Sequence, residues 1–239
     1  MTRLLAIDTS STWCSVALFS DDEEPIFRHE QLAASASQYL LPWIQEILLE
    51  KNIQLHELDG IGVGVGPGAF TGVRLSIAVA QGLAYAAKIP VFPVISLDAI
   101  AMQSIQKPAF LKYKPERFLV CIDARMEEVY WAVYEMIIFN AKETPRRIGG
   151  IHLTKPENLD LNGVDFLVGN GAAAYKDRIL LSSAAPFPRE NIDTDVNIHS
   201  LGILLCALDM LKNGQQQDVH DLEPVYVRNK VARTVLERA

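Results

Sequence analysis

Apolar and polar positions alternate along the first half of the chain with two different periods. Apolar runs typical of strands come first, and over 37–51 the spacing changes to three and four residues, which is typical of a helix. On this helix, one face is predicted to carry Leu40, Leu41, Ile44, Ile47 and Leu48. The predicted elements are strands at 3–8, 14–20 and 26–31, a helix at 37–51, a strand at 60–66, a helix at 71–87, a strand at 91–94 and a helix from Leu97.

The second half of the chain repeats this order more loosely. Its predicted elements are strands at 117–123, 129–137, 147–153 and 165–169 and helices at 172–181 and 198–213. Strands followed by helices, twice in tandem, predict an α/β protein built from two mixed sheets with flanking helices.

An internal repeat relates the two halves. When Asp8 is aligned with Asp123, residues 4–19 and 119–134 both read as an apolar strand ending in Ile-Asp, a polar turn and a second apolar strand. Chance similarity between apolar strands is the alternative, but an offset of 115 residues, about half the chain, favours duplication. The sequence therefore predicts two similar domains.

The boundary between these domains is predicted in the segment 104–117, which holds two prolines and four basic residues. The predicted organisation is an N-terminal domain at 1–107, a linker at 108–115 and a C-terminal domain at 116–239. The second domain ends in a basic tail that could pack back on the first. Its basic residues are Arg228, Lys230, Arg233 and Arg238.

Composition narrows the class of protein. The 239 residues are 49% hydrophobic and 21% charged, which is typical of a globular chain and excludes disorder. With 22 basic and 29 acidic side chains the net charge is −7, so the chain is a poor candidate for holding nucleic acid by itself. There is no apolar run of the ~20 residues that a membrane helix needs, no secretory leader, and three widely spaced cysteines that read as reduced thiols. These features predict a cytoplasmic protein with no membrane partner.

A glycine-rich turn joins the strand at 60–66 to the next helix. Its candidate residues are Gly66, Pro67, Gly68, Phe70, Thr71 and Gly72. Backbone amides at such a helix start can hold an anion, but the turn lacks the Lys-Ser/Thr pair of a P-loop and the spacing of GxGxxG. We therefore predict a structural turn in which glycine permits close packing.

The two repeated hairpin turns carry the candidate cleft residues Asp8, Thr9, Ser10 and Asp123. Acid-bearing turns that face each other across a cleft form the phosphate site of the actin, sugar kinase and heat-shock ATPase superfamily. A Gly-Asn-Gly turn at 169–171 is either a plain strand-to-helix turn or, as in that superfamily, a wall beside a nucleotide base. The five histidines show no metal-ligand spacing and are expected at the surface or at helix caps: His29, His56, His152, His199 and His220.

Four segments carry a closer resemblance. IDTSS at 7–11, GPGAFTGVRLSIAVAQGLA at 66–84, KIPVFPVISLDAIA at 88–101 and PVYVRNKVA at 224–232 resemble the bacterial TsaB (YeaZ) family. The resemblance implies the two-domain superfamily fold and a part in making threonylcarbamoyladenosine on tRNA. It also implies that the phosphate site of the cleft is vestigial and that no cofactor is bound.

The resemblance further implies that the chain is a non-catalytic scaffold. The related transferase subunit, TsaD, has a metal-binding His-x-x-x-His pattern, and the matching positions here are Ser96 and Ile100, so no metal site is expected. Implied partners are a TsaD-like metal-dependent transferase, a TsaE-like ATPase, tRNA through the complex, and a second copy when the chain is alone. The alternative function is a stand-alone ATPase or small-molecule kinase that uses Asp8 and Asp123 around Mg²⁺.

An apolar surface is predicted to hold the partner. The helix at 71–87 is apolar around most of its circumference, which is typical of a helix buried on two sides. Its sheet face is predicted to carry Leu75, Val79, Gly82, Leu83 and Ala86. The predicted interface residues are Tyr39, Trp43, Arg74, Ile77, Ala78, Gln81 and Tyr85. In the family, such a helix pair docks on the same pair of the relative and forms a four-helix bundle; the alternative is that the two helices cover only each other.

Overall fold

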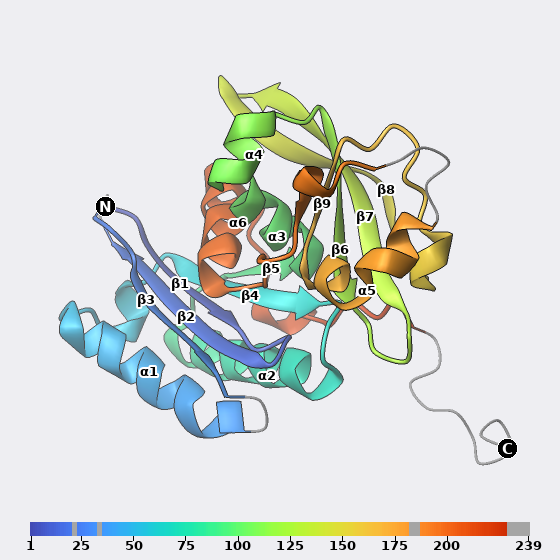
Figure 1. The fold of residues 1–239 in the computed structure, drawn as a ribbon. Helices are drawn as coiled ribbons and strands as arrows, with labels where there is room; N and C mark the ends of the chain where they lie inside the picture. Colours follow the sequence, from blue (N-terminus) through green and yellow to red (C-terminus); the bar gives the residue numbers. More distant parts are fainter. Residues whose placement is uncertain (21–22, 33–34, 182–186, 229–239) are drawn as a thin grey trace, which may run out of the picture.

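The computed structural model describes residues 1–20, 23–32, 35–181 and 187–228. Within them the chain forms two five-stranded mixed sheets, ordered β3-β2-β1-β4-β5 and β10-β9-β6-β7-β8 (Figure 1). Helices cover both faces of the first sheet, one of these layers lies between the two sheets, and a further helix packs on the second sheet, as expected for an α/β protein.

The first sheet begins with the predicted antiparallel meander, and β4 and β5 then join it in parallel. Its strands are β1 (Arg3–Asp8), β2 (Trp13–Ser20), β3 (Ile26–Gln31), β4 (Gly60–Gly66) and β5 (Val91–Ile95). Alternate side chains of β1 point to opposite faces, so Leu5 and Ile7 meet α1 (Ala36–Glu50) and α2 (Phe70–Ala87). Leu4 and Ala6 meet the other layer, α3 (Ser96–Ser104) and α6 (Ser200–Lys212).

The second sheet has the same topology as the first. Its strands are β6 (Arg117–Asp123), β7 (Val129–Phe139), β8 (Lys142–Thr154), β9 (Phe166–Val168) and β10 (Ile192–Asp193). In each sheet the first strand pairs antiparallel with the second and parallel with the fourth, and a helix follows the fourth. In the second sheet that helix is α5 (Asn170–Leu180). This strand-by-strand equivalence agrees with the repeat seen in the sequence.

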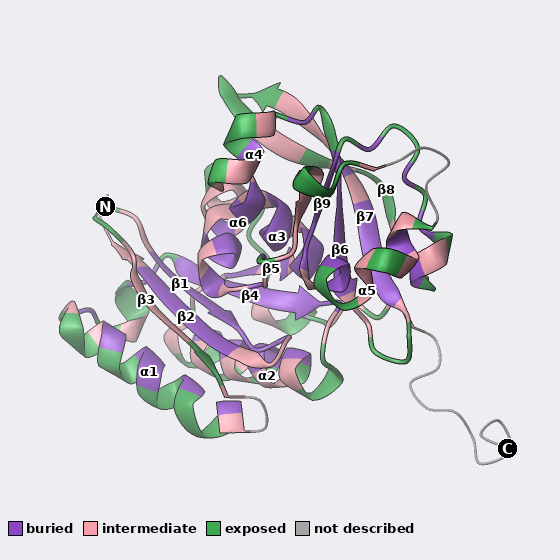
Figure 2. Cartoon of the chain, in the orientation of Figure 1, coloured by how far each residue is buried: buried purple, intermediate pink, exposed green. Residues whose placement is uncertain are grey.

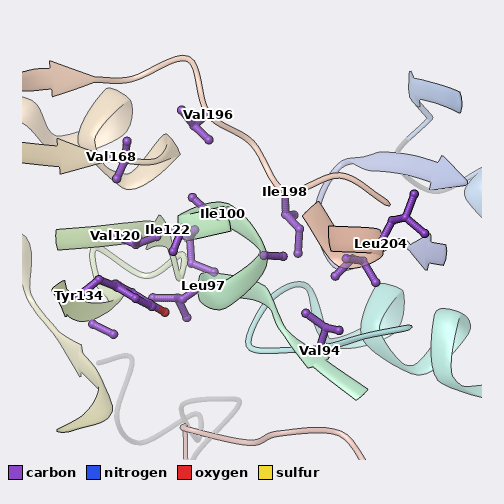
Figure 3. Packing of buried hydrophobic residues seen from close by; sticks show 14 of the residues in the cluster. Val94, Leu97, Ile100, Val120, Ile122, Tyr134, Val168, Val196, Ile198 and Leu204 are labelled. Atoms are coloured by element: carbon purple, nitrogen blue, oxygen red, sulfur yellow. The ribbon is translucent and has the colours of Figure 1, made fainter. Parts of the chain in front are cut away.

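The layer of α3 and α6 joins the two sheets into one core. Leu97 and Ile100 of α3 lie among Val120 and Ile122 of β6 and Leu204 of α6 (Figure 3). Figure 2 shows the buried residues continuing from the strands of one sheet through this layer to the other. Relative motion of the sheets would therefore have to shear packed side chains of α3.

Two parts of the chain differ from the simple two-domain plan. The predicted linker holds a short helix, α4 (Pro108–Tyr113), whose Phe110 is buried against Phe118 and Phe166. After β10 the chain returns to the first sheet, where α6 packs on β1, β2, β4 and β5. Neither α4 nor β10 was predicted from the sequence, because each is too short to show a periodic pattern.

Some predictions concern residues outside the described ranges. Lys230, Arg233 and Arg238 of the basic tail lie there. Arg228 is described. In the ranges that the structure covers, every helix is too short or too polar to cross a bilayer.

Candidate functional site

The glycine-rich turn packs directly on the β1–β2 turn. The Thr9 hydroxyl donates to the Gly72 carbonyl (2.6 Å), and the Ala69 N–H donates to the Ser10 carbonyl (2.6 Å). A Cβ at Gly72 would lie 1.8 Å from the Thr9 carbonyl oxygen, and one at Gly68 would lie 2.3 Å from that of Ser10. Because the chain's own carbonyls occupy this helix start, the turn acts as a backbone joint, which supports its predicted structural role.

Asp8 lies behind this joint. Its side chain has no exposed surface, and its Oδ2 accepts a hydrogen bond from the Ser10 N–H (3.1 Å). Within the described chain, Oδ1 has no partner, and a Cβ at Gly64 would lie 2.1 Å from it. Burial raises the pKa of Asp8 to about 6. A phosphate or metal ion in the cleft could therefore reach this carboxyl only if the turn opened.

Asp123, its counterpart in the repeat, lies at the cleft surface. Its Oδ1 accepts from the Arg125 N–H (2.8 Å) and the Tyr175 hydroxyl (3.2 Å), and its Oδ2 lies 3.4 Å from an Arg125 guanidinium nitrogen. A pocket of about 140 Å³ lies between the two repeated turns, lined by Ser10 on one wall and Asp123 on the other. The structure thus brings two of the four predicted cleft residues to the pocket, whereas Asp8 and Thr9 are buried beneath it.

The positions that would need metal-binding histidines are also closed. Ser96 and Ile100 are fully buried; the Ser96 hydroxyl lies 3.4 Å from that of Ser10, and Ile100 packs in the core between the sheets (Figure 3). Over the described ranges, no group of three or more His, Cys, Asp or Glu side chains is placed to hold a metal ion. The donor set that these residues offer is one hydroxyl and one alkyl group, which does not fit a transition metal.

On α2 the orientation differs from the prediction. The buried side is formed by Val73, Ser76, Ile77, Ala80 and Ala84. Ile77 therefore faces the sheet, whereas Gly82, predicted on that face, is exposed, and a Cβ added to it would meet no atom within 4 Å. Arg74, Ala78 and Tyr85 are exposed as predicted, and Gln81 is half-buried. The exposed stripe of α2 consists of Arg74, Ala78, Gly82, Tyr85 and Ala86.

On α1 a similar correction applies to Trp43. Its side chain is only 7% exposed and packs with Leu40, Ile44 and Ile47 in the core beneath the sheet. Leu41, predicted on the buried face, is instead 50% exposed. Tyr39 is exposed as predicted, and Leu49 adds a large apolar side chain that sequence reasoning missed.

A groove lies between α1 and α2 and is also bordered by Ile53, Gln54 and Leu55, which follow α1. Its volume is about 530 Å³, and its lining includes Leu41, Ile44 and Leu48 of α1 and Leu83 of α2. We call the exposed stripe of α2, the exposed apolar residues of α1 and this groove the α1–α2 face. Because Leu41 and Leu49 of α1 and Tyr85 of α2 are exposed, the two helices do not fully cover each other.

A histidine pair outside the cleft was missed by the sequence pattern because its members are distant in the chain. His29 of β3 stacks on Trp13 (4.4 Å between ring centroids), and His199, at the start of α6, lies edge-on to His29 (5.5 Å). Both Nδ1 atoms are buried and have no partner in the described part of the chain. Burial lowers the pKa of both rings, that of His199 to about 4, with His29 and Lys107 contributing to the latter.

Acidification should therefore weaken the fold through His199. An imidazole with a depressed folded-state pKa contributes stability that is complete above the unfolded pKa near 6.5 and is lost as the pH falls toward 4. His199→Gln should flatten this acid-side loss in urea titrations between pH 7 and 4, relative to the wild type. His56→Gln, at an exposed position, is the control. Equal pH profiles for His199→Gln and the wild type would contradict the assignment.

Two topologically equivalent mixed sheets, joined at a cleft with one turn from each, place the chain in the class of two-domain proteins of the actin, sugar kinase and heat-shock ATPase superfamily. The family model "TsaD: tRNA N6-adenosine threonylcarbamoyltransferase" matches residues 30–232. The chain belongs, more narrowly, to the TsaB (YeaZ) family within this class.

Relatives of full length support this assignment. The tRNA threonylcarbamoyladenosine biosynthesis protein TsaB of Escherichia coli K12 is 36% identical, with 96% of each chain covered. The protein of the same name from Haemophilus influenzae is 34% identical, with 95% of this chain and 94% of that one covered. Among solved structures, YeaZ from Pseudomonas aeruginosa superposes with a TM-score of 0.79 at 32% identity, over 95% of this chain and all of that one.

Proposed function

We propose that this chain takes part in the biosynthesis of threonylcarbamoyladenosine on tRNA as a non-catalytic scaffold subunit. The names of its full-length relatives support the pathway. The burial of the cleft's candidate chemical groups supports the scaffold role, because Asp8 lies behind the glycine turn and Ser96 and Ile100 provide no metal ligands. Its place of action would be the cytoplasm, where tRNA is modified.

The α1–α2 face is the observation that carries the proposal. It presents large apolar side chains of which Leu41 is 50%, Leu49 69% and Tyr85 67% exposed. Between them, Ala78 and Gly82 leave the α2 backbone open to close approach by another helix, and the groove between α1 and α2 can receive side chains of that helix. Exposed apolar surface of this kind, with aromatic anchors, is typical of a docking surface.

The proposed partner is a TsaD-like transferase subunit. This chain itself matches the TsaD family model over most of its length, so a TsaD-type relative would carry an equivalent pair of helices. Two such pairs, packed face to face, form a four-helix bundle with a pseudo-twofold axis. In the absence of the relative, a second copy of this chain is the natural substitute. A TsaE-like ATPase and tRNA would join through the complex.

Ala78→Glu should weaken docking of the TsaD-like subunit by about thirtyfold or more, which corresponds to ~2 kcal/mol. The reason is that a carboxylate at the centre of the bundle would be buried without a partner. Affinity would be measured by titration calorimetry, alongside tRNA modification by the reconstituted system and circular dichroism of the isolated variant.

Ala174→Glu is the matched control, because Ala174 is an exposed alanine on α5 in the second domain. It should leave affinity and modification unchanged. Native affinity of Ala78→Glu would place the docking surface elsewhere and remove the structural basis of the scaffold role.

A further inference from the structure

The segment 222–228 crosses from the first sheet to the second. Leu222 is 2% exposed and packs in the core beneath α2, where its carbonyl accepts from the Gln81 side-chain amide (3.0 Å). Three residues on, the Val225 N–H donates to the Val65 carbonyl at the end of β4 (2.8 Å). The segment is thereby fixed to the helix that carries the α1–α2 face and to the strand before it.

Tyr226 connects this segment to the exposed side of α2. The Arg74 Nε donates to the Tyr226 hydroxyl (3.0 Å), and the Arg74 guanidinium lies 3.7 Å from the centroid of the Phe70 ring. Arg74 also belongs to the exposed stripe of the α1–α2 face. A partner that covers this stripe would therefore contact Arg74 and so affect the hydrogen bond from Arg74 to Tyr226.

Arg228 makes the contact with the second sheet. Its side chain is only 13% exposed, and its Nη2 donates to the Glu128 carboxylate (2.6 Å) and to the Ala124 carbonyl (3.2 Å). The Arg125 carbonyl lies within reach at 3.5 Å. All three acceptors face the same nitrogen, Nη2, and belong to the β6–β7 turn, so one charged group holds several atoms of the turn together.

This turn has an unfavourable backbone. Arg125, Met126 and Glu127 have φ values of 61°, 54° and 60°, so three successive residues with side chains adopt the left-handed conformation. Such residues persist only where surrounding contacts enforce them. The turn also presents Arg125, whose side chain is 75% exposed, to the pocket between the two repeated turns. The shape of this cleft wall therefore depends on the contacts that stabilise the left-handed backbone of the turn.

We propose that residues 222–228 form a clasp. Arg228 holds the β6–β7 turn in its left-handed form, and Tyr226 connects the same segment to Arg74, so that docking on α2 and the shape of the cleft wall are coupled. The first part concerns the chain alone. The second part rests on the proposed function, because it requires a partner on the α1–α2 face. The two arrangements of the coupled element are the clasped turn and a released turn with relaxed backbone angles.

Hydrogen exchange of the isolated chain tests the first part. In the clasped turn the amides of Ala124, Arg125 and Glu128 are hydrogen-bonded, so release must expose them. Arg228→Gln should speed exchange over 124–128 at least tenfold. Arg228→Lys should do so to a smaller extent, because an ammonium can replace Nη2 but not also Nη1, which lies 2.7 Å from the Met126 sulfur. Arg146→Gln, which removes an ion pair to Glu135 elsewhere on the second sheet, should leave this turn unchanged. Native exchange rates in both Arg228 variants would overturn the clasp.

Exchange in the complex tests the coupling. Docking of the TsaD-like subunit should slow exchange over 124–128 in the wild type. Tyr226→Phe, which removes the hydroxyl that accepts from Arg74, should reduce this slowing while the subunit still binds. Binding without any change at the turn would overturn the coupling and leave the scaffold proposal standing. If Ala78→Glu bound normally, the scaffold proposal would fail instead, and the isolated-chain experiment would still decide the clasp.

Discussion

Gly72→Ala should lower the melting temperature of the isolated chain by roughly 6–12 °C, which corresponds to a loss of ~3 kcal/mol for a chain of this size. The new Cβ would lie 1.8 Å from the Thr9 carbonyl oxygen, a distance at which the backbone must move. Overpacking of this kind costs ~1–3 kcal/mol, and the hydrogen bond from Thr9 to the Gly72 carbonyl would be lost as well, at ~1 kcal/mol.

Gly82→Ala is the matched control on the same helix. At Gly82 a Cβ would meet no atom within 4 Å, so only the helix preference of alanine remains. This preference is worth ~1 kcal/mol and should raise the melting temperature by ~2–4 °C. Opposite signs at two glycines ten residues apart would establish the backbone joint, and equal small shifts at both would contradict it.

Periodicity predicted most of the fold because most elements are long enough to show it. The exposed Leu41 and the buried Trp43 show that the prediction assigned the wrong side of α1 to the core. Leu40, Trp43, Ile44 and Ile47 follow the spacing i, i+3, i+4, i+7, so the signal for a buried Trp43 was present in the sequence. The prediction instead took Leu40, Leu41, Ile44, Ile47 and Leu48 as the buried face, which places Leu41 inside and Trp43 outside.

On α2 two apolar stripes compete, because Leu75, Val79 and Leu83 are spaced as regularly as the buried Val73, Ile77, Ala80 and Ala84. Ala78, Gly82 and Ala86 are as compatible with a tight contact to the sheet as with an exposed stripe, and Ile77 lies only one residue from Ala78. Small residues around much of the helix leave its rotation undetermined by sequence. In the structure it is the side with Val73, Ser76, Ile77, Ala80 and Ala84 that is buried. Composition alone predicted an interface helix but not which of its faces is open.

The remaining features depend on contacts between distant residues. Arg228 meets a turn about 100 residues earlier in the chain, and His199 meets His29 across a still longer separation, so neither contact leaves a local pattern. Asp8 was predicted at a phosphate site from its place in a repeated turn. Its burial arises from Gly64 and the Thr9–Gly72 contact, which no spacing rule encodes. The sequence thus indicates which residues are unusual, whereas tertiary packing decides whether they are accessible.

The buried carboxyl of Asp8 should make the wild type lose stability as the pH rises from 4 to 7.5, relative to Asp8→Asn. Its folded-state pKa of about 6 exceeds the ordinary value of 3.8, so the folded chain binds this proton more tightly than the unfolded chain. Stability is therefore greatest below the unfolded pKa and is lost as the pH rises through the folded pKa. A shift of about two pKa units corresponds to ~3 kcal/mol between the two ends of this range.

Asparagine keeps the acceptor for the Ser10 N–H but cannot ionise. Any change that the buried amide makes to the free energy of unfolding does not depend on pH. This change cancels when the difference in unfolding free energy between wild type and variant at pH 4 is subtracted from the difference at pH 7.5. This double difference, obtained from urea unfolding, should favour Asp8→Asn by ~3 kcal/mol at the higher pH. Because His199 and His29 titrate equally in both proteins, their opposite acid-side effect drops out. A double difference near zero would mean that Asp8 ionises freely, and that the joint over it opens far more readily than its contacts indicate.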